Sequence, residues 1–186
     1  IRGTFRTQGW AHFHSVSYRI LFSEPADSIR MFTDGKETPA SVPSKMHSDK
    51  DLKYHFKFPA SDKPLLVKVA LSPVDPDGAV KNMESELPEW DFDATVAQSE
   101  QVWNEALNRV SMTSSDPVVM KNFYTALYHS MIAPFAYQDV DGRYLGMDKQ
   151  VHTAEAGYTN YTVFSLWDTF RALHPLMTII DPEIGR

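Results

Sequence analysis

Close to Asp91, the spacing of apolar residues along the chain changes from two to about 3.6. Before this point apolar and polar residues alternate, as in the runs VSYRILFS (16–23), YHFKF (54–58) and PLLVKVAL (64–71). Alternation is typical of half-buried antiparallel strands, whereas the longer spacing is typical of amphipathic helices. The sequence therefore predicts a mixed, multidomain fold. Its first part is a partial antiparallel β-sandwich, and its second part is helical.

Turn sequences separate the predicted strands. Gly and Pro interrupt pairing in SEPADS (23–28), TDGKETPASVPS (33–44) and SPVDPDG (72–78). An open or stacked antiparallel sheet therefore fits better than a parallel one. The residues expected on the apolar faces are Val16, Tyr18, Ile20 and Phe22 in the first run, Tyr54, Phe56 and Phe58 in the second, and Leu65, Val67, Val69 and Leu71 in the third.

Two helices are expected directly after the change in spacing. The first is capped by Asp91 or Asp93, and the second begins at Asp116 with Pro117 at its first helical position and ends near Pro134. The apolar face of the first helix is expected to carry Val96, Trp103, Ala106, Leu107 and Val110, and that of the second Met120, Phe123, Tyr124, Leu127, Tyr128 and Met131.

A third helix is predicted from a cap at Thr159 or Asn160 through His174, with a kink at Pro175. A long polar connection, AYQDVDGRYLGMDKQVHTAEAGYTN (136–160), precedes it. Connections of this length inside compact domains are usually functional or disordered. The aromatic and Gly content of this one argues for a functional, ordered loop.

Composition excludes several classes of partner and site. Lys and Arg number 18 against 24 Asp and Glu, a net charge of −6, so nucleic acid is not expected as a partner. The absence of Cys excludes disulfides, thiolate metal sites and Cys nucleophiles. The longest apolar runs fall short of the roughly 20 residues that span a bilayer. Because the chain begins without Met or a signal pattern and ends just after a helical pattern, we expect an internal segment of a longer protein.

Three short motifs favour structural roles. His12 and His14 share one strand face without a marked third metal ligand, so they are interpreted as surface histidines. The DVDG sequence from Asp139 to Gly142 begins like a calcium loop but lacks the closing Glu, which favours a type I turn. Asn160-Tyr161-Thr162 matches a glycosylation sequon, but its place at a predicted helix start favours capping.

The densest cluster of chemically useful side chains is SLWDTFRALHP (165–175), with Trp167, Asp168, Arg171 and His174. One interpretation is an Asp168–Arg171 ion pair on a helix surface beside a core Trp. The other is a sugar site, in which the Trp167 ring covers a sugar face and Asp168 accepts hydrogen bonds from two neighbouring hydroxyls. The repeated dipeptide Trp90-Asp91 is interpreted as structural, because it lies at a strand-to-helix junction.

Two long runs resemble a known family. FYTALYHSMIAPFAYQDVDGRYLGMD (123–148) followed by NYTVFSLWDTFRALHPLMTIIDPE (160–183) is similar to the start of the catalytic domain of glycoside hydrolase family 92, the calcium-dependent exo-α-mannosidases. VKVALSPVDPDGAVKNMESELPEWDFDATVAQSEQVWNEALNRV (67–110) resembles the family's crossing from sandwich to catalytic domain, and GTFRTQGW (3–10) with ILFSEP (20–25) resembles strands of its N-terminal sandwich.

The resemblance implies an N-terminal β-sandwich packed on a helical (α/α)6 barrel, with the sugar site at their interface. Residues 1–90 would then be the C-terminal part of the sandwich, 91–112 a linker helix and 113–186 the start of the barrel. An inverting, calcium-assisted glycoside hydrolase of the α-1,2-mannosidase type is implied, acting on mannose-terminated glycans in the periplasm, at the cell surface or outside the cell. Trp167 and Asp168 would bind the terminal mannose, Arg171 would orient Asp168, and the loop from Gly142 to Asp148 could line the mouth of the pocket.

The family's general acid, its base and most of its calcium ligands lie beyond the position of Arg186, so no catalytic or metal-binding residue is assigned in this chain. The remainder of the enzyme polypeptide is therefore an expected partner. Two alternatives remain: a non-enzymatic carbohydrate-binding or assembly module, and a helical-barrel glycosidase acting on another hexose.

Overall fold

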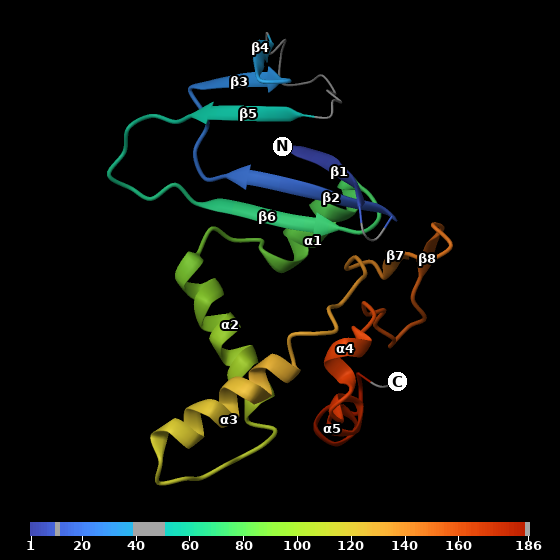
Figure 1. Cartoon of the computed structure of the whole chain (residues 1–186). Coiled ribbons are helices and arrows are strands. Elements are labelled where there is room, and N and C mark those ends of the chain that lie inside the picture. The colour runs from blue at the N-terminus through green and yellow to red at the C-terminus, as the bar shows by residue number, and fades with distance from the viewer. Residues whose placement is uncertain (10–11, 39–50, 185–186) are drawn as a thin grey trace. The chain divides into compact units, whose positions relative to one another are not determined.

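The computed structural model describes residues 1–9, 12–38 and 51–184 of the chain, in which antiparallel sheets precede most of the helices (Figure 1). These residues form two compact units. One consists of Leu21–Lys68, and the other of Ile1–Ile20 together with Val69–Arg186. The antiparallel sheets followed by helices agree with the predicted order of the fold. The domain limits at residues 90 and 112 remain a prediction.

The Leu21–Lys68 unit contains a sheet in the order β4-β3-β5, formed by β3 (Ser28–Thr33), β4 (Lys36–Thr38) and β5 (Leu52–Lys57). In the antiparallel register of β3 with β5, the buried Met31 lies opposite Tyr54. The rings of Phe56 and Phe58 lie 5.2 and 5.1 Å from that of Phe22. Burial alternates strictly along β5, so the predicted apolar face of the second run is confirmed.

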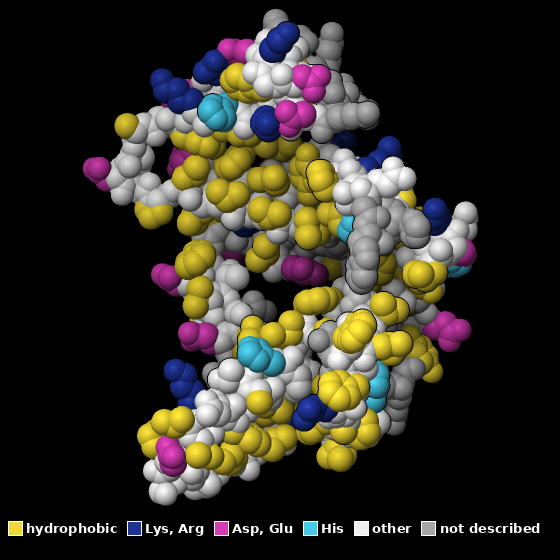
Figure 2. Space-filling view, in the orientation of Figure 1, with side chains coloured by type: hydrophobic (Ala, Val, Ile, Leu, Met, Phe, Trp, Pro, Cys, Tyr) yellow, Lys and Arg dark blue, Asp and Glu magenta, His cyan; other side chains and the backbone are white. Residues whose placement is uncertain are grey.

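A second sheet has the order β1-β2-β6, formed by β1 (Arg2–Gly9), β2 (His12–Phe22) and β6 (Val67–Ser72). β1 pairs with β2 in an antiparallel register that sets Phe5 opposite Val16. Burial alternates along β6, as the sequence predicts, but its large apolar residues Val67, Val69 and Leu71 are on the exposed side, and Leu71 is 57% exposed. Apolar side chains gather on the surface over this sheet (Figure 2). The buried side of β6 ends at Ser72, beside Gly78 of the helix that follows.

That helix, α1 (Pro76–Glu86), is a correction to the sequence prediction, which assigned SPVDPDG to a turn. Asp75 is its N-cap and accepts a hydrogen bond from the Gly78 N–H at 2.6 Å, and Pro76 occupies the first turn. The pair Asp75-Pro76 therefore has the same role that the sequence assigned to Asp116-Pro117. Gly78, Ala79, Asn82 and Met83 form the buried side of α1.

The first two predicted helices are confirmed. α2 (Phe92–Leu107) has Asp91 as its N-cap, which decides between the two candidates, and the Asp91 carboxylate accepts from Ala94 N–H at 2.8 Å. α3 (Pro117–Ser130) has Asp116 as its N-cap. Tyr128 of α3 lies with its ring 4.7 Å from that of Trp103 of α2. Every residue of α2 is exposed or half-buried. On its predicted apolar face Trp103, Ala106 and Leu107 are half-buried and Val96 is exposed, so this face is only partly covered within this chain.

The third predicted helix is wrong in its limits. Residues 159–165 are not helical, and the chain instead forms two short helices, α4 (Leu166–Thr169) and α5 (Leu173–Ile180). They are separated at Ala172, which has a φ of +69°, a left-handed conformation that ends a right-handed helix. Pro175 lies in the first turn of α5, where Pro is tolerated, so the break comes before it rather than at it.

The long connection before α4 contains a small hairpin of β7 (Arg143–Leu145) and β8 (Val151–Thr153). Within the described ranges, none of the helices has the length and apolar character to cross a membrane.

Candidate functional site

Trp167 is placed on α4 with its side chain 88% exposed. Its neighbours Leu166 and Phe170 are exposed as well, so α4 presents an open apolar surface. Asp168 lies in the same helix, but its side chain is outside the described part of the structure. A broad, exposed indole face beside a carboxylate-bearing position is chemically suited to a sugar ring. Exposure of Trp167 disagrees with its interpretation as a core residue within this chain.

Arg171 and His174 are not on one continuous helix with Asp168. Arg171 lies in the turn after α4 ends at Thr169, and His174 lies on α5, beyond the left-handed Ala172. The Arg171 guanidinium lies over the Phe170 ring, 5.1 Å from its centroid, and His174 packs edge-on against Phe164 at 4.8 Å. The role of Arg171 in orienting Asp168 remains a prediction.

Two antiparallel segments, residues 135–138 and 160–162, pair with each other before α4 and hold the chain there. We call this pair of segments the loop ladder. The Tyr137 N–H donates to the Asn160 carbonyl at 2.7 Å, and the Thr162 N–H donates to the Phe135 carbonyl at 2.8 Å. Side chains complete it: Asn160 Nδ2 donates to the Tyr137 carbonyl at 2.9 Å. The predicted capping role of Asn160 is therefore wrong, since this residue pairs with a distant loop instead of starting a helix.

Directly after the ladder, Asp139 is 1% exposed and its carboxylate binds two different elements. The Ser72 hydroxyl donates to Oδ2 at 2.9 Å, and Asn82 Nδ2 donates to Oδ1 at 2.9 Å. The Asn82 side chain also accepts from the Val140 N–H at 2.9 Å. We call Ser72, Asn82 and Asp139 the buried cluster. It joins the end of β6, α1 and the DVDG sequence.

The DVDG sequence forms the predicted turn, in which the Gly142 N–H donates to the Asp139 carbonyl at 2.8 Å and Gly142 has a φ of +81°. The carboxylates of Asp139 and Asp141 in this turn contact basic side chains and hydrogen-bond donors of the protein. Lys81 Nζ donates to Asp141 at 2.7 Å, and Arg143 contacts both Asp141 and Asp75. The hydrogen bond from Lys81, followed by the contacts of Arg143, lowers the pKa of Asp141 to about 2. The hydrogen bond from Arg143 lowers the pKa of Asp75.

The hairpin beyond this turn carries an exposed contact between His152 and Asp148, with His152 Nε2 lying 2.9 Å from Asp148 Oδ2. The Gln150 N–H and His152 lower the pKa of Asp148. A Cβ on Gly146 would lie 2.5 Å from Asp148 Oδ1, so this pair closes tightly over the glycine. The role of the Gly142 to Asp148 loop at a pocket mouth remains a prediction.

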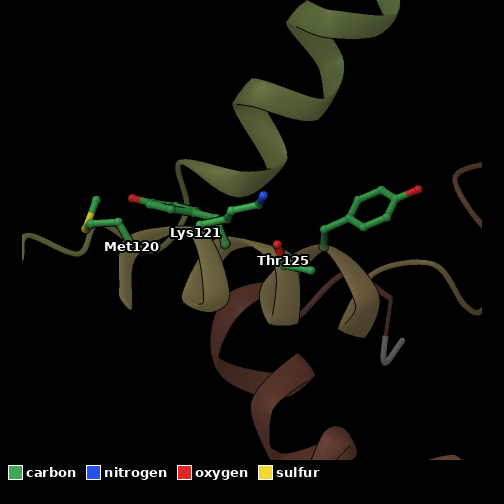
Figure 3. A pocket seen from close by; sticks show the side chains of 5 residues that line it. Met120, Lys121 and Thr125 are labelled. Carbon is green, nitrogen blue, oxygen red and sulfur yellow. The ribbon is translucent and has the colours of Figure 1, made fainter. Parts of the chain in front are cut away.

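Within the described residues, no group of three or more His, Asp or Glu side chains is arranged to hold a metal ion. His14 is exposed on β2, and the His12 side chain is outside the described part. A shallow hollow runs along α3, lined by Met120, Lys121, Tyr124, Thr125 and Tyr128 (Figure 3). It includes none of the predicted sugar-binding residues.

The comparison with known proteins decides the family. The family model for the glycosyl hydrolase family 92 catalytic domain matches residues 78–186. The chain belongs to glycosyl hydrolase family 92. This match confirms the resemblance and places the chain in a family of hydrolases.

Solved family 92 structures agree with this assignment. The family GH92 α-mannosidase BT3965 from Bacteroides thetaiotaomicron is 34% identical with a TM-score of 0.84, over 99% of this chain and 25% of that one. The GH92 family glycosyl hydrolase ccman5 is 27% identical with a TM-score of 0.87, over 98% of this chain and 24% of that one. An uncharacterized secreted glycosidase of Arthroderma benhamiae is 36% identical over 74 residues, which are 38% of this chain and 10% of that protein. The chain thus spans about a quarter or less of the length of these relatives.

Sequence reasoning missed the buried cluster. Asp139 was interpreted only as a turn residue, and Ser72 and Asn82 carry no local signal of burial. The Asp-Pro pair at 75–76 is a local signal for a helix start, and it predicts α1 and with it a helix beside the end of β6.

Proposed function

We propose that the chain is the sandwich-to-barrel segment of an exo-acting α-mannosidase of family 92, which removes terminal α-linked mannose from glycans. The observation that carries the proposal is the match of the catalytic-domain model over residues 78–186. Similarity over 99% of the chain to a solved α-mannosidase adds support. The exposed Trp167 supplies a surface of suitable chemistry.

The proposed architecture is a β-sandwich followed by an (α/α)6 barrel, each seen in part. Two observations support it. The apolar side of β6 is open to solvent in this chain and the apolar face of α2 is only partly covered. Large exposed apolar surfaces usually mark contacts with further protein. In the complete enzyme we expect the rest of the sandwich to cover the first surface and the later barrel helices to cover the second.

In the proposed sugar site, Trp167 packs against the apolar face of the terminal mannose and the Asp168 carboxylate accepts hydrogen bonds from two adjacent hydroxyls. Hydrogen bonds to a charged acceptor are stronger than neutral ones, and two of them on neighbouring hydroxyls select the sugar's stereochemistry. Arg171 orients Asp168 in this proposal.

We propose an inverting reaction, in which an acid protonates the leaving oxygen and a base on the opposite sugar face activates water. The solved mannosidase BT2199 from Bacteroides thetaiotaomicron is described as inverting and shares the fold, with 24% identity and a TM-score of 0.71. The acid and the base are expected from other parts of the polypeptide. Calcium is the proposed cofactor, and the described residues do not supply a cage for it, because the DVDG carboxylates are engaged by Ser72, Asn82, Lys81 and Arg143.

The complete enzyme is expected to release mannose from α-mannobiosides. A panel of α-1,2, α-1,3, α-1,4 and α-1,6 substrates, followed by proton NMR, would report the preferred linkage and the first anomer formed. We expect the α-1,2 substrate to be preferred and the released sugar to be the β-anomer, because inversion changes the anomeric configuration. EDTA should remove activity, and Ca²⁺ but not Mg²⁺ should restore it. Binding without hydrolysis would favour a carbohydrate-binding module, and a preference for glucosides or galactosides would favour another barrel glycosidase.

Asp168→Ala in the complete enzyme is expected to lower kcat/KM about a hundredfold, since two charged hydrogen bonds would be lost. Trp167→Ala should raise KM about tenfold through loss of ring stacking. Initial rates on an α-mannobioside and melting temperatures would be measured together. Thr178→Ala is a matched control, because its hydroxyl donates only to the Pro175 carbonyl within α5. Wild-type kinetics in folded Asp168→Ala would contradict the proposed site.

The relative from Arthroderma benhamiae is described as secreted. We propose that the complete enzyme likewise works outside the cytoplasm, in the periplasm, at the cell surface or in the medium, where glycans with terminal mannose are accessible.

A further inference from the structure

Thr162 makes two hydrogen bonds to a single residue of the opposite segment of the loop ladder. Its N–H donates to the Phe135 carbonyl at 2.8 Å, and its Oγ1 accepts from the Phe135 N–H at 2.9 Å. The side chain therefore replaces the main-chain acceptor that a regular strand would offer. Next to it, Ala136 and Tyr161 form an antiparallel bridge.

The other end of the loop ladder is fixed to the interior. The segment 135–138 leads directly into Asp139, whose buried carboxylate binds Ser72 and Asn82. Asn160 adds a second attachment, because its N–H donates to Gln138 Oε1 at 2.7 Å and its side chain to the Tyr137 carbonyl. The position of residues 160–162 is therefore set by a buried part of the fold.

Beyond Thr162 the chain has few restraints before Trp167. Residues 163–165 have no regular structure, and α4 is a single turn. Within the described part of the chain, the Ser165 side chain makes no cap hydrogen bond to α4. Val163, Leu166 and Trp167 are mostly exposed, and the ring contact of Phe164 with His174 is the main packing interaction of this stretch.

We infer that Thr162 is a positioning residue for Trp167, which holds the segment leading into α4 so that the indole face meets the sugar. The inference rests on the proposed function, because it assigns Thr162 a role in binding through Trp167. Its Oγ1 is the acceptor that fixes this segment five residues before the indole. No contact between Thr162 and the sugar is involved.

The test compares Thr162→Val with Thr162→Ser in the complete enzyme. Val keeps the shape and the main-chain bond but removes the acceptor for the Phe135 N–H, whereas Ser keeps the acceptor. Loss of one hydrogen bond is expected to speed amide exchange of residues 163–169 and to raise KM for an α-mannobioside, each about fivefold, with kcat within about twofold of wild type. Thr162→Ser should have the amide exchange rate and the KM of the wild type. Thr178→Val, whose hydroxyl bond lies within α5, should leave both unchanged.

A double variant separates this inference from the proposed function. If Thr162 acts through Trp167, adding Thr162→Val to Trp167→Ala should leave KM at the value of Trp167→Ala alone. Additive effects would overturn the inference, as would unchanged exchange or unchanged KM in Thr162→Val. An unchanged KM in Trp167→Ala would instead overturn the proposed sugar site, and with it the role of Thr162 in binding. In that case, faster amide exchange in Thr162→Val but not in Thr162→Ser would show that the Thr162 hydrogen bond orders the chain without contributing to sugar binding.

Discussion

Asp139→Asn is expected to destabilise the region joining β6, α1 and the DVDG turn by about 2 to 4 kcal/mol. The substitution keeps the size of the side chain, so the loss would come from hydrogen bonding and charge alone. The side chain is 1% exposed, which prevents water from replacing lost partners.

The geometry around Oδ2 explains why an amide cannot replace this carboxylate. The Ser72 hydroxyl donates its proton to Oδ2, while its own oxygen accepts from the N–H groups of Val74 at 3.0 Å and Asp75 at 3.2 Å. An amide nitrogen in place of Oδ2 would point donors at an oxygen whose lone pairs are already used. Flipping the amide would only move the conflict to Oδ1, which accepts from Asn82. Arg143, 3.7 Å from Oδ2, would lose a counter-charge as well.

The measurement is urea unfolding of the complete enzyme together with amide exchange of α1. Asp77→Asn is the matched control, because it changes the same residue type in α1 at an exposed ion pair with Arg2. Exposed pairs contribute about 0 to 1 kcal/mol, so the control should be nearly neutral at pH 7. Equal losses of stability in the two variants would contradict the importance of the buried cluster.

Sequence patterns predicted local structure well where a local signal decides it. The sequence predicts Asp116 as one helix cap and narrows the other to Asp91 or Asp93, because a cap depends on one side chain and the next three N–H groups. Alternation along β6 was also correct. The side of β6 that is covered could not be predicted, because it depends on α1, and the turn-like sequence around Gly78 concealed that helix.

The limits of α4 and α5 illustrate a tertiary effect. Apolar spacing through residues 163–174 fits one helix, but the structure separates two at Ala172, and the loop ladder determines the backbone up to Thr162. Hydrogen bonds between residues more than twenty positions apart have no periodic signature. Trp167 could be predicted as a candidate from its residue type, but what holds it in place could not.

Gly78→Ala is expected to cost about 3 kcal/mol or more, although Ala favours helix over Gly by about 1 kcal/mol. A Cβ at this position would overlap Asp139 Oδ2 and lie 2.6 Å from Ser72 Oγ and 2.9 Å from Asp139 Cγ. None of these atoms can move freely, because each belongs to the buried cluster. The close approach of α1 to Asp139 thus requires glycine. Unfolding in urea would measure the loss, with Gly157→Ala as the control.

Gly157 has open space around it and a φ of +87°, so its substitution should cost only the backbone strain of about 1 to 2 kcal/mol. The overlap itself is tested by combining Gly78→Ala with Asp139→Ala. Removing the carboxylate makes room for the new methyl group, so the double variant should be less destabilised than the sum of the two single variants. Strict additivity would mean that the cost of Gly78→Ala comes from elsewhere. Coupling of about 1 kcal/mol or more would instead establish that overlap with the buried carboxylate causes a large part of the cost, so that the position of Asp139 is one reason why α1 requires glycine there.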